Sequence, residues 1–463
     1  MLASMRARSL LLICAIALAH AAAYIVHQRP DWGISWTDQA GYQRLGAVLA
    51  ETGMFTRYPE SPTFIPEVIR TPGYPAFVAL IYMLFGVGNQ MALVIAQAFV
   101  FAALCIVVFA VARRVTSERN ALLAALLAAM FPPLPYFGAL ALTELWTTFV
   151  AAVAMLICLR AVQSGRVVHY AIAGALLSLT TLVRPAFVLL PYFLAIGVPL
   201  LIPAQRQRRA LIGWAALCVA ATVTLAPWFA YNYIHLGRVT LSPAGGIGRG
   251  LWEAAWQGRW PGRVQAALTD AATTAPSVDD LDRHADVIAA DTGLDAGPMR
   301  TYLHEWRTIH ELWDTPTDPM ERINARIAAD REYFDAAMRH VRADPIGHIW
   351  RRVTRGPFLL WAADIPVRHS SINSLPPLVI RAIWLAQVLL IGVAGIGAFH
   401  LIRAGRRLEA ALLVLPLIYV TAVHLPLLCE ARQSLPVKPL VIVLAAVGIT
   451  YLGNAGRKTP ASP

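Results

Sequence analysis

The chain has 463 residues, of which 57% are hydrophobic and only 14% charged, and its mean hydropathy is +0.56. Water-soluble globular proteins carry about 25% charged residues, so the composition excludes that class and indicates a polytopic membrane protein. The net charge of +12 comes mostly from Lys and Arg in short loops between apolar runs, a distribution typical of membrane topology signals. We therefore expect membrane lipids, and not nucleic acid, around this protein.

The apolar runs predict ten membrane spans, each close to the ~20 residues that cross a bilayer. They lie at residues 9–27, 90–112, 119–133, 138–160, 168–184, 186–203, 208–230, 376–402, 408–427 and 436–453. The first could be a cleaved signal peptide, because Ala19-His20-Ala21 has the small-x-small form; we expect a retained span, since many spans follow.

A further run, Tyr74 to Val87, has only 14 residues. If it crossed the membrane, Arg113, Arg114 and the basic residues 206–209 would lie outside, against the positive-inside rule. We therefore predict that it either dips in and returns or lies tilted at the interface, which leaves both termini cytoplasmic; a crossing would raise the number of spans to eleven or more.

The predicted organisation has three parts: an N-terminal transmembrane module (1–231) that includes an outer loop at 28–72, an outer domain (232–375), and C-terminal transmembrane helices (376–463). The outer domain is polar, with apolar residues at helical spacing. Ser277 and Thr317-Asp318-Pro319 are typical helix starts, and Asp344-Pro345 is a typical stop. The aromatic and basic stretch at 346–364 suits a helix at the membrane interface.

The stretch from Trp36 to Pro75 keeps charged residues between two apolar runs, and charge beside a bilayer is usually functional. Under the predicted topology, several acids and arginines fall on this same side: Asp38, Arg70, Glu144, Arg184, Glu430 and Arg432. An arginine can bind a phosphate bidentately, and a carboxylate can take a proton from a hydroxyl. The pattern therefore favours chemistry on a lipid-borne anionic substrate.

Each of these residues also has a structural interpretation. Asp38 could cap the helix that follows it, Arg70 could extend to lipid headgroups, and Arg184 could complement a helix dipole. Glu430 and Arg432 could form a local ion pair. The five cysteines lie in or beside apolar segments without paired spacing, and the histidines lack metal-site spacing, so neither group predicts a site.

Motifs in a fixed order resemble the bacterial GT-C integral-membrane glycosyltransferases, which include polyprenyl-phosphate-sugar-dependent mannosyl- and aminoarabinose transferases. The matching positions run over nearly the whole chain: Asp38, Tyr42, Leu45, Leu49, Gly53 and Phe55; Arg70 to Pro75; Leu84 to Gly86; Pro132 to Glu144; Leu182 to Pro185; Pro227, Trp228, Asn232 and Gly237; Glu430, Arg432, Leu435, Pro436 and Pro439. The chain departs from the usual pattern at Gly46, Tyr231 and Gln433.

The resemblance implies an all-α polytopic membrane protein: a GT-C-like bundle of about ten or eleven transmembrane helices with a helical periplasmic insertion, in the bacterial inner membrane. It implies transfer of a sugar, with inversion, from a polyprenyl-phosphate donor to a lipid, glycan or protein acceptor at the periplasmic face. The implied catalytic residues are Asp38 (the base) and Glu144, with Arg70, Arg184 and Arg432 on the donor phosphate. Candidate substrate-binding residues are Tyr42, Tyr74, Trp228, Asn232 and Glu430. Some members of the family bind a divalent metal ion and others need none, so metal dependence stays open.

Two other functions remain possible. A transporter or flippase for lipid-linked sugars would also collect charges near the membrane, but the chain shows no repeated halves and no interrupted spans at the midplane. A polysaccharide polymerase or ligase of another fold would also have many spans and a large outer loop. The acidic first loop followed by RTPGYP favours the GT-C interpretation over both.

Overall fold

A computed structural model describes residues 2–32, 37–314, 316–367 and 374–455, and Trp36 lies outside them. Within these ranges the chain is all-α, with nineteen α-helices and no strand. The helices of the bundle are α1 (Leu2–Gln28), α3 (Gly73–Phe85), α4 (Gln90–Val115), α5 (Glu118–Ala129), α6 (Pro133–Gly138), α7 (Glu144–Ser164), α8 (Val167–Val183), α9 (Leu190–Leu201), α10 (Arg208–Leu236), α17 (Pro377–Arg403), α18 (Arg407–His424) and α19 (Lys438–Ala455).

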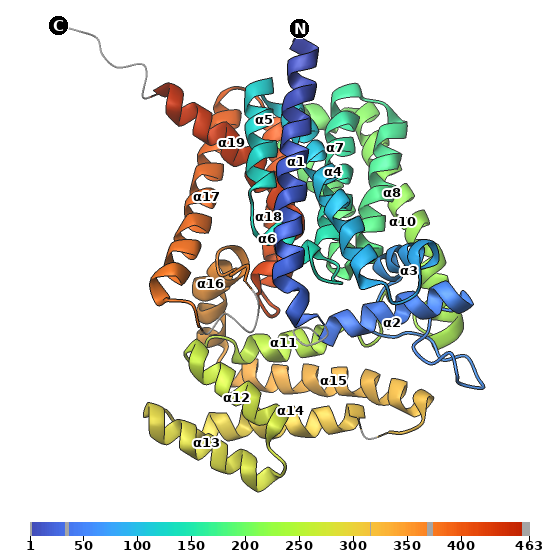
Figure 1. Ribbon diagram of the computed structural model, residues 1–463, viewed down its shortest axis with the longest axis vertical. Coiled ribbons are helices and arrows are strands. Elements are labelled where there is room, and N and C mark those ends of the chain that lie inside the picture. The colour runs from blue at the N-terminus through green and yellow to red at the C-terminus, as the bar shows by residue number, and fades with distance from the viewer. Residues whose placement is uncertain (1, 33–36, 315, 368–373, 456–463) are drawn as a thin grey trace, which may run out of the picture.

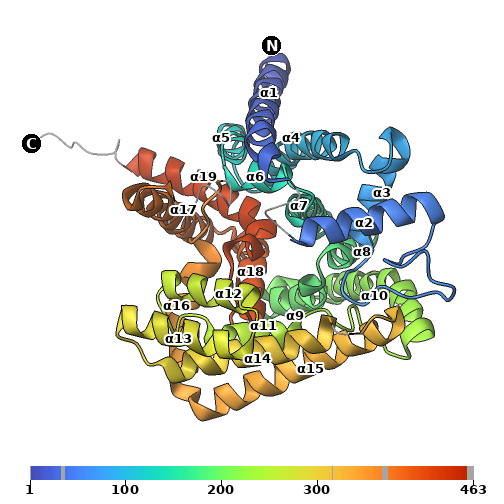
Figure 2. The ribbon, with the colours of Figure 1, turned by 60° about the horizontal axis from the view of Figure 1, so that its bottom comes forward.

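The remaining helices lie together at one end of this bundle (Figure 1). They are α2 (Thr37–Thr52), α11 (Ile247–Trp256), α12 (Gly262–Thr274), α13 (Val278–Thr292), α14 (Ala296–Asp314), α15 (Pro319–Ala343) and α16 (Pro345–Trp361). We call this end of the bundle the loop end. Figure 2 shows α11 to α15 as a layer across it.

Seven helices in the described part of the chain are long and apolar enough to cross a membrane: the apolar helices that begin at residues 6, 90, 144, 208, 377, 407 and 435. Three shorter apolar helices, at 73–85, 167–183 and 185–201, accompany them. The predicted fold class, an all-α polytopic membrane protein with a helical insertion, is confirmed. Seven of the ten predicted spans are helices of this length, and the spans predicted at 168–184 and 186–203 are shorter apolar helices.

Two predicted spans have different bounds in the structure. The span expected at 119–133 is a helix of only 12 residues, Glu118–Ala129, because Pro132 and Pro133 follow it and disfavour a continuous helix. The span expected at 138–160 begins at Glu144. The turns between α6 and α7 therefore place the Glu144 carboxylate at the start of a helix, inside the bundle.

Basic residues meet at the end of the bundle opposite the loop end. Arg6 in α1 lies 3.9 Å from Glu118 at the start of α5, and Arg406, between α17 and α18, donates to the carbonyl oxygen of Val115 at the end of α4 (2.6 Å). Since α4 runs from there to the loop end, both ends of the short helix α3 lie at the loop end.

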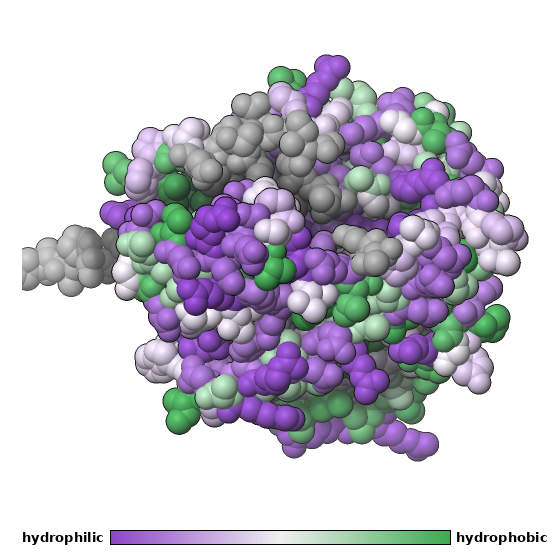
Figure 3. Space-filling model, turned by 90° about the horizontal axis from the view of Figure 1, so that it is seen from below, coloured by the Kyte–Doolittle hydropathy of each residue, from purple (hydrophilic) through white to green (hydrophobic). Residues whose placement is uncertain are grey.

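The helical domain, α11 to α15, has an aromatic core of its own. Trp252, Trp256 and Tyr333 are buried in it. Two predicted starts are confirmed: Ser277 caps α13 and Asp318 caps α15 through their side-chain oxygens. Asp344 ends α15 as predicted, and its carboxylate also caps α16. Hydrophilic side chains predominate on the outer face of this end (Figure 3), as expected for a surface in water.

Candidate functional site

Six predicted residues lie together at the loop end and form a chain of ion pairs, which we call the ion-pair cluster. Its members are Asp38, Arg70, Glu144, Arg184, Glu430 and Arg432. Arg70 binds Asp38 (2.8 Å), Arg432 lies 3.7 Å from Asp38 and 3.8 Å from Glu144, and Arg184 lies 3.5 Å from Glu144. Glu430 accepts a hydrogen bond from Arg432 (2.8 Å). Three carboxylates thus face three guanidiniums drawn from five separate segments.

Asp38 lies in the first turn of α2, and its carboxylate contacts Arg70 and Arg432 across space. Leu45 and Val48, on the buried face of α2, fix the helix against the bundle. The Asp38 side chain is 46% exposed, whereas that of Glu144 is 3% exposed. Asp38 is therefore the carboxylate that an incoming molecule can reach, and Glu144 is the internal one.

Arg70 is held on several sides. Its guanidinium lies 4.5 Å from the centre of the Tyr42 ring, a cation–π contact, and it covers Gly41, where any added Cβ would come within 2.5 Å of it. The Glu67 carboxylate accepts hydrogen bonds from the backbone N–H groups of Ile69 (2.8 Å) and Arg70 (3.0 Å). The backbone and the side chain of Arg70 are thus both fixed.

Glu67 is a residue to which the sequence analysis gave no role. It is buried at 4% exposure and receives both Nε (2.5 Å) and Nη2 (3.1 Å) of Arg57. Buried carboxylates need such partners. The sequence did carry a signal for this pair. Glu67 is an acid among hydrophobic residues, and the same loop also holds Arg57.

The Glu144 segment is positioned by two glutamines. Gln39 in α2 accepts a hydrogen bond from the N–H of Ala141 (2.8 Å), and Gln97 in α4 donates to the carbonyl oxygens of Gly138 (2.9 Å) and Leu140 (2.8 Å). These bonds satisfy a buried turn that could not otherwise lie inside an apolar bundle. Glu144 Oε2 is buried without a hydrogen-bond partner in the described part of the chain.

Tyr42 and Tyr74, both predicted to bind substrate, pack edge to face with ring centroids 5.2 Å apart. Tyr42 supports Arg70, and burial raises the pKa of its hydroxyl. Tyr74 is fully buried, and its hydroxyl donates to Gln97 (3.0 Å). Tyr74 therefore has a supporting position beneath the cluster, without an open face for substrate.

Trp228 and Asn232, also predicted to bind substrate, hold the chain where it leaves α10. Trp228 donates to the carbonyl oxygen of Leu241 (2.8 Å) and stacks on Tyr231. Asn232 is fully buried and donates to the carbonyl oxygen of Thr240 (2.6 Å). These contacts give both residues a structural position beside the cluster.

Arg432 is the centre of the cluster. Burial alone would lower its pKa, but the carboxylates of Glu430, Glu144 and Asp38 outweigh burial and raise it. Removing any of these carboxylates would therefore leave a partly buried cation less well compensated.

The helical domain reaches the cluster through α11. Arg249 and Glu253 form an ion pair on this helix (2.9 Å). Burial raises the pKa of Glu253, although Arg249 opposes the shift. The charge of Asp38 acts on Arg249, and the charges of Glu430 and Arg432 act on Glu253. Sequence reasoning missed this pair because Arg249 lies in a glycine-rich stretch that matches no known loop pattern.

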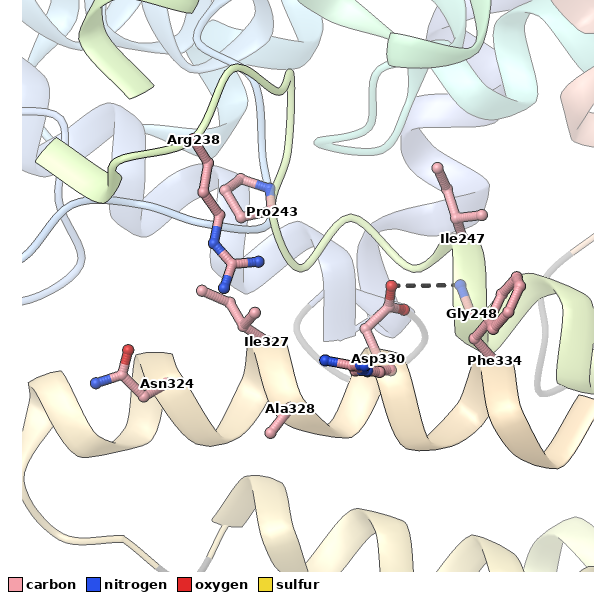
Figure 4. Close-up of a pocket in the computed structure, with 10 residues that line it drawn as sticks. Arg238, Pro243, Ile247, Gly248, Asn324, Ile327, Ala328, Asp330 and Phe334 are labelled. Atoms are coloured by element: carbon pink, nitrogen blue, oxygen red, sulfur yellow. Dashed lines mark hydrogen bonds between the residues drawn. The ribbon is translucent and has the colours of Figure 1, made fainter. Parts of the chain in front are cut away.

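A cavity of about 550 Å³ lies on the other side of the start of α11, between it and α15. Figure 4 shows Asp330 of α15 directed at Gly248, and Arg238 projecting from the segment before α11. Asp330 accepts hydrogen bonds from the N–H groups of Gly248 (3.3 Å) and Arg249 (3.2 Å) and so caps α11. This cap fixes the turn that carries Arg249.

The predicted carboxylates do not fit a metal site. Within the described residues, no group of three or more His, Cys, Asp or Glu side chains could hold a metal ion. Asp38 and Glu144 share the guanidinium of Arg432, and a cation between them would have to displace it. The carboxylates present are paired with arginines.

Comparisons with known proteins agree with this architecture. Residues 69–231 match the family model described as dolichyl-phosphate-mannose-protein mannosyltransferase. The Archaeoglobus fulgidus oligosaccharyltransferase AglB, solved with an inhibitory peptide and a dolichol-phosphate, superposes with a TM-score of 0.54 at 13% identity, over 98% of this chain and 52% of that chain. The chain has the GT-C fold. The resemblance to GT-C glycosyltransferases that the motifs indicated is thereby confirmed.

Two further structures are similar to this GT-C chain. The A. fulgidus oligosaccharyltransferase tethered to an acceptor peptide with the NVT sequon has a TM-score of 0.53 at 13% identity, over 96% of this chain and 50% of that chain. ArnT from Cupriavidus metallidurans bound to undecaprenyl phosphate has a TM-score of 0.41 at 14% identity, over 98% and 81%. The chain spans about half the length of the archaeal enzymes it matches. No curated protein matches its sequence.

Proposed function

We propose that this GT-C chain transfers a sugar from a polyprenyl-phosphate donor to an acceptor at the outer face of a bacterial inner membrane. The observation that carries the proposal is the ion-pair cluster: three arginines and three carboxylates gathered at the water boundary of an apolar bundle. The donor and the polyprenyl phosphate product both carry phosphate, for which guanidinium groups are the preferred protein ligands.

In the proposed reaction Asp38 is the base. The acceptor hydroxyl attacks the anomeric carbon, its proton passes to the Asp38 carboxylate, and the bond between that carbon and the phosphate oxygen breaks. The polyprenyl phosphate leaves with the electron pair. Attack from the face opposite the leaving group inverts the anomeric centre. The exposure of Asp38 supports this role, because a base must reach the incoming hydroxyl.

Arg70, Arg184 and Arg432 would stabilise the charge that develops on the leaving phosphate. In the structure the six members of the cluster carry no net charge, with three positive and three negative groups. A donor phosphate must therefore replace a carboxylate as the ion-pair partner of one or more of these guanidiniums. Asp38, which shares Arg70 and Arg432, is the most exposed partner, so donor binding would free the base that the next step needs.

Glu144 has an internal role in this scheme. Its Oε1 holds Arg184 and Arg432 in place, and its unpartnered Oε2 is available to a sugar hydroxyl. Tyr42 would keep Arg70 in position, and Glu430 would do the same for Arg432. These assignments need no metal ion.

The orientation follows from the distribution of charge. Basic residues at the starts of α1 and α10 and between α17 and α18 mark the end opposite the loop end, and positive loops face the cytoplasm. The ion-pair cluster and the helical domain would then face the periplasm. The acceptor class stays open among lipid, glycan and protein.

The direct test is sugar transfer by the purified full chain in detergent, with a synthetic polyprenyl-phosphate sugar and cell-envelope extract as a source of acceptors. We expect release of polyprenyl phosphate and a new glycan, lipid or protein conjugate. A transporter or flippase would release none and would instead move the intact donor across vesicles. That result would overturn the proposal.

A further inference from the structure

The segment from Leu425 to Glu430 connects α18 to the 3-10 turn Ala431–Gln433 that carries Arg432. It makes several hydrogen bonds with the helical domain. The N–H of Leu428 donates to the carbonyl oxygen of Gly250 in α11 (2.9 Å). Gln257, just after α11, accepts from the N–H of Cys429 (3.0 Å) and donates to its carbonyl oxygen (2.8 Å). The Gln257 amide thus binds Cys429 as a neighbouring strand would.

Arg352 of α16 holds the same segment from another side. Its Nε donates to the carbonyl oxygen of Leu425 (2.8 Å), and its Nη2 donates to the carbonyl oxygen of Leu427 and contacts Cys429 Sγ (2.8 Å). Its Nη1 donates to Gln257 Oε1 (2.7 Å). One guanidinium therefore fastens three residues of the segment and the amide that binds it.

Burying the Arg352 guanidinium is unfavourable, so close packing alone does not explain an arginine at this position. Arg352 is 4% exposed, and no carboxylate in the described part of the chain lies within ion-pair distance of it. Burial accordingly lowers its pKa. A buried cation without an acid partner is unfavourable, whereas a neutral side chain could fill the same space. The fixed fork of donors is what an apolar residue could not supply.

The backbone of α16 also packs closely against residues 425–430. A Cβ on Gly356, one turn after Arg352, would lie 2.8 Å from a methyl carbon of Leu425 and 3.4 Å from Cys429 Sγ. The backbone of α16 therefore rests directly on the segment. The segment ends at Glu430, and Arg432 follows two residues later. The position of the segment therefore determines where Arg432 lies.

We propose that Arg352 is a positioning residue that holds residues 425–430 against α11 and α16 and so places Arg432 between Asp38 and Glu144. The inference deepens the proposed function and, for its kinetic part, rests on it. It makes the docking of α11 and α16 on this segment a condition for an assembled ion-pair cluster, although Arg352 itself touches neither Asp38 nor Glu144.

The first experiment compares Arg352→Gln, Arg352→Lys and the control Arg355→Gln in the purified full chain. Arg355 lies on the same helix and donates to the carbonyl oxygen of Gly258, away from the segment. With a polyprenyl-phosphate sugar, we expect Arg352→Gln to lower kcat about tenfold or more with the acceptor KM changed less than threefold. Arg352→Lys should recover part of the loss, and Arg355→Gln should stay within twofold of wild type. Equal losses in the two glutamine variants would overturn the proposal.

The second experiment needs no catalysis. Amide hydrogen exchange should become faster at residues 425–433 in Arg352→Gln, while α14 and α15 keep wild-type protection. Binding of a polyprenyl phosphate should weaken about as much in Arg352→Gln as in Arg432→Gln, and the double variant should lose no more. If wild type transfers no sugar, the proposed function fails while these two measurements still decide the positioning role.

The positioning role of Arg352 would be contradicted by unchanged amide hydrogen exchange at residues 425–433, or by additive losses of polyprenyl phosphate binding in the double variant. Should Arg352→Gln not fold, Gln257→Ala removes the opposing contact with Cys429, and the same faster exchange and weaker binding are expected. Wild-type behaviour of Gln257→Ala would then count against the proposal.

Discussion

Arg432 Nη1 lies 3.7 Å from Asp38 Oδ2, which joins the last loop of the chain to its first. The same atom is 3.8 Å from Glu144 Oε1. The three residues come from separate parts of the sequence, so this contact forms only when the chain folds. One guanidinium is thus shared by two carboxylates.

Replacing Arg432 with Gln should lower transfer about 100-fold or more. The change removes contacts with Asp38, Glu144 and Glu430 at once, and breaking a buried, hydrogen-bonded charge pair typically costs about 2–5 kcal/mol. Steady-state transfer rates measure the effect.

The matched control is Arg44→Gln, because Arg44 forms an exposed pair with Glu60 (3.3 Å) on the same helix as Asp38, outside the cluster. Comparable losses in the two variants would show that Arg432 acts only through general stability.

Gly41→Ala should impair transfer while leaving the fold intact. A Cβ at this position would come within 2.5 Å of the Arg70 guanidinium, so Arg70 must leave Asp38 and the Tyr42 ring. We expect about a tenfold weaker apparent affinity for a polyprenyl phosphate, measured by equilibrium binding. Gly395→Ala, in α17, meets nothing within 4 Å and should bind as wild type does; equal binding by both variants would argue against Arg70 as a phosphate ligand.

The stability of the helical domain should depend on Glu305. Burial raises the pKa of its carboxyl, but hydrogen bonds with His340 and Trp252 and the charge of Arg339 outweigh burial and hold it below its ordinary value. The ionised form is thus favoured by folding. Its contribution is present above the unfolded pKa of about 4.3 and is lost as the pH falls through the folded value.

Glu305→Gln should therefore lower the free energy of unfolding of the domain by about 1–2 kcal/mol at pH 7, with a smaller difference from wild type below pH ~4. Hydrogen exchange in α13 to α15 of the full chain, measured at both pH values, gives the difference. Glu332→Gln, at an exposed position of α15, is the control. A difference that stays constant with pH would mean that the Glu305 charge is not involved.

Removal of divalent metal ions should leave transfer unchanged. The cluster pairs its carboxylates with arginines, and phosphate charge would be neutralised by the same guanidiniums. Transfer after dialysis against a chelator, compared with transfer after adding back Mg²⁺ or Mn²⁺, checks this. A rate that depends on the added metal would assign the carboxylates to a cation.

Much of the architecture could be predicted from residue patterns, because membrane spans and helix caps are local signals. Composition identified the membrane class, and the start signals at Ser277 and Asp318 were borne out as caps. The bounds of α5 and α7 were missed, since the prolines and turns between them interrupt one continuous apolar run.

The gathering of Asp38, Glu144 and Arg432 could be anticipated because topology places all three on one side. Their supports could not. Gln97 and Arg352 act through contacts between segments far apart in the chain, and nothing local distinguishes them from ordinary polar residues. For the same reason the hydrogen bonds of Tyr74 with Gln97 and of Asn232 with the carbonyl oxygen of Thr240 could not be predicted.

The most direct test compares wild type with Asp38→Asn in a single assay: sugar transfer from a synthetic polyprenyl-phosphate donor, with donor binding measured on the same samples. The account predicts transfer by wild type, and no detectable transfer but retained donor binding by Asp38→Asn, since asparagine fits the space yet cannot take the proton. Full transfer by Asp38→Asn would contradict it.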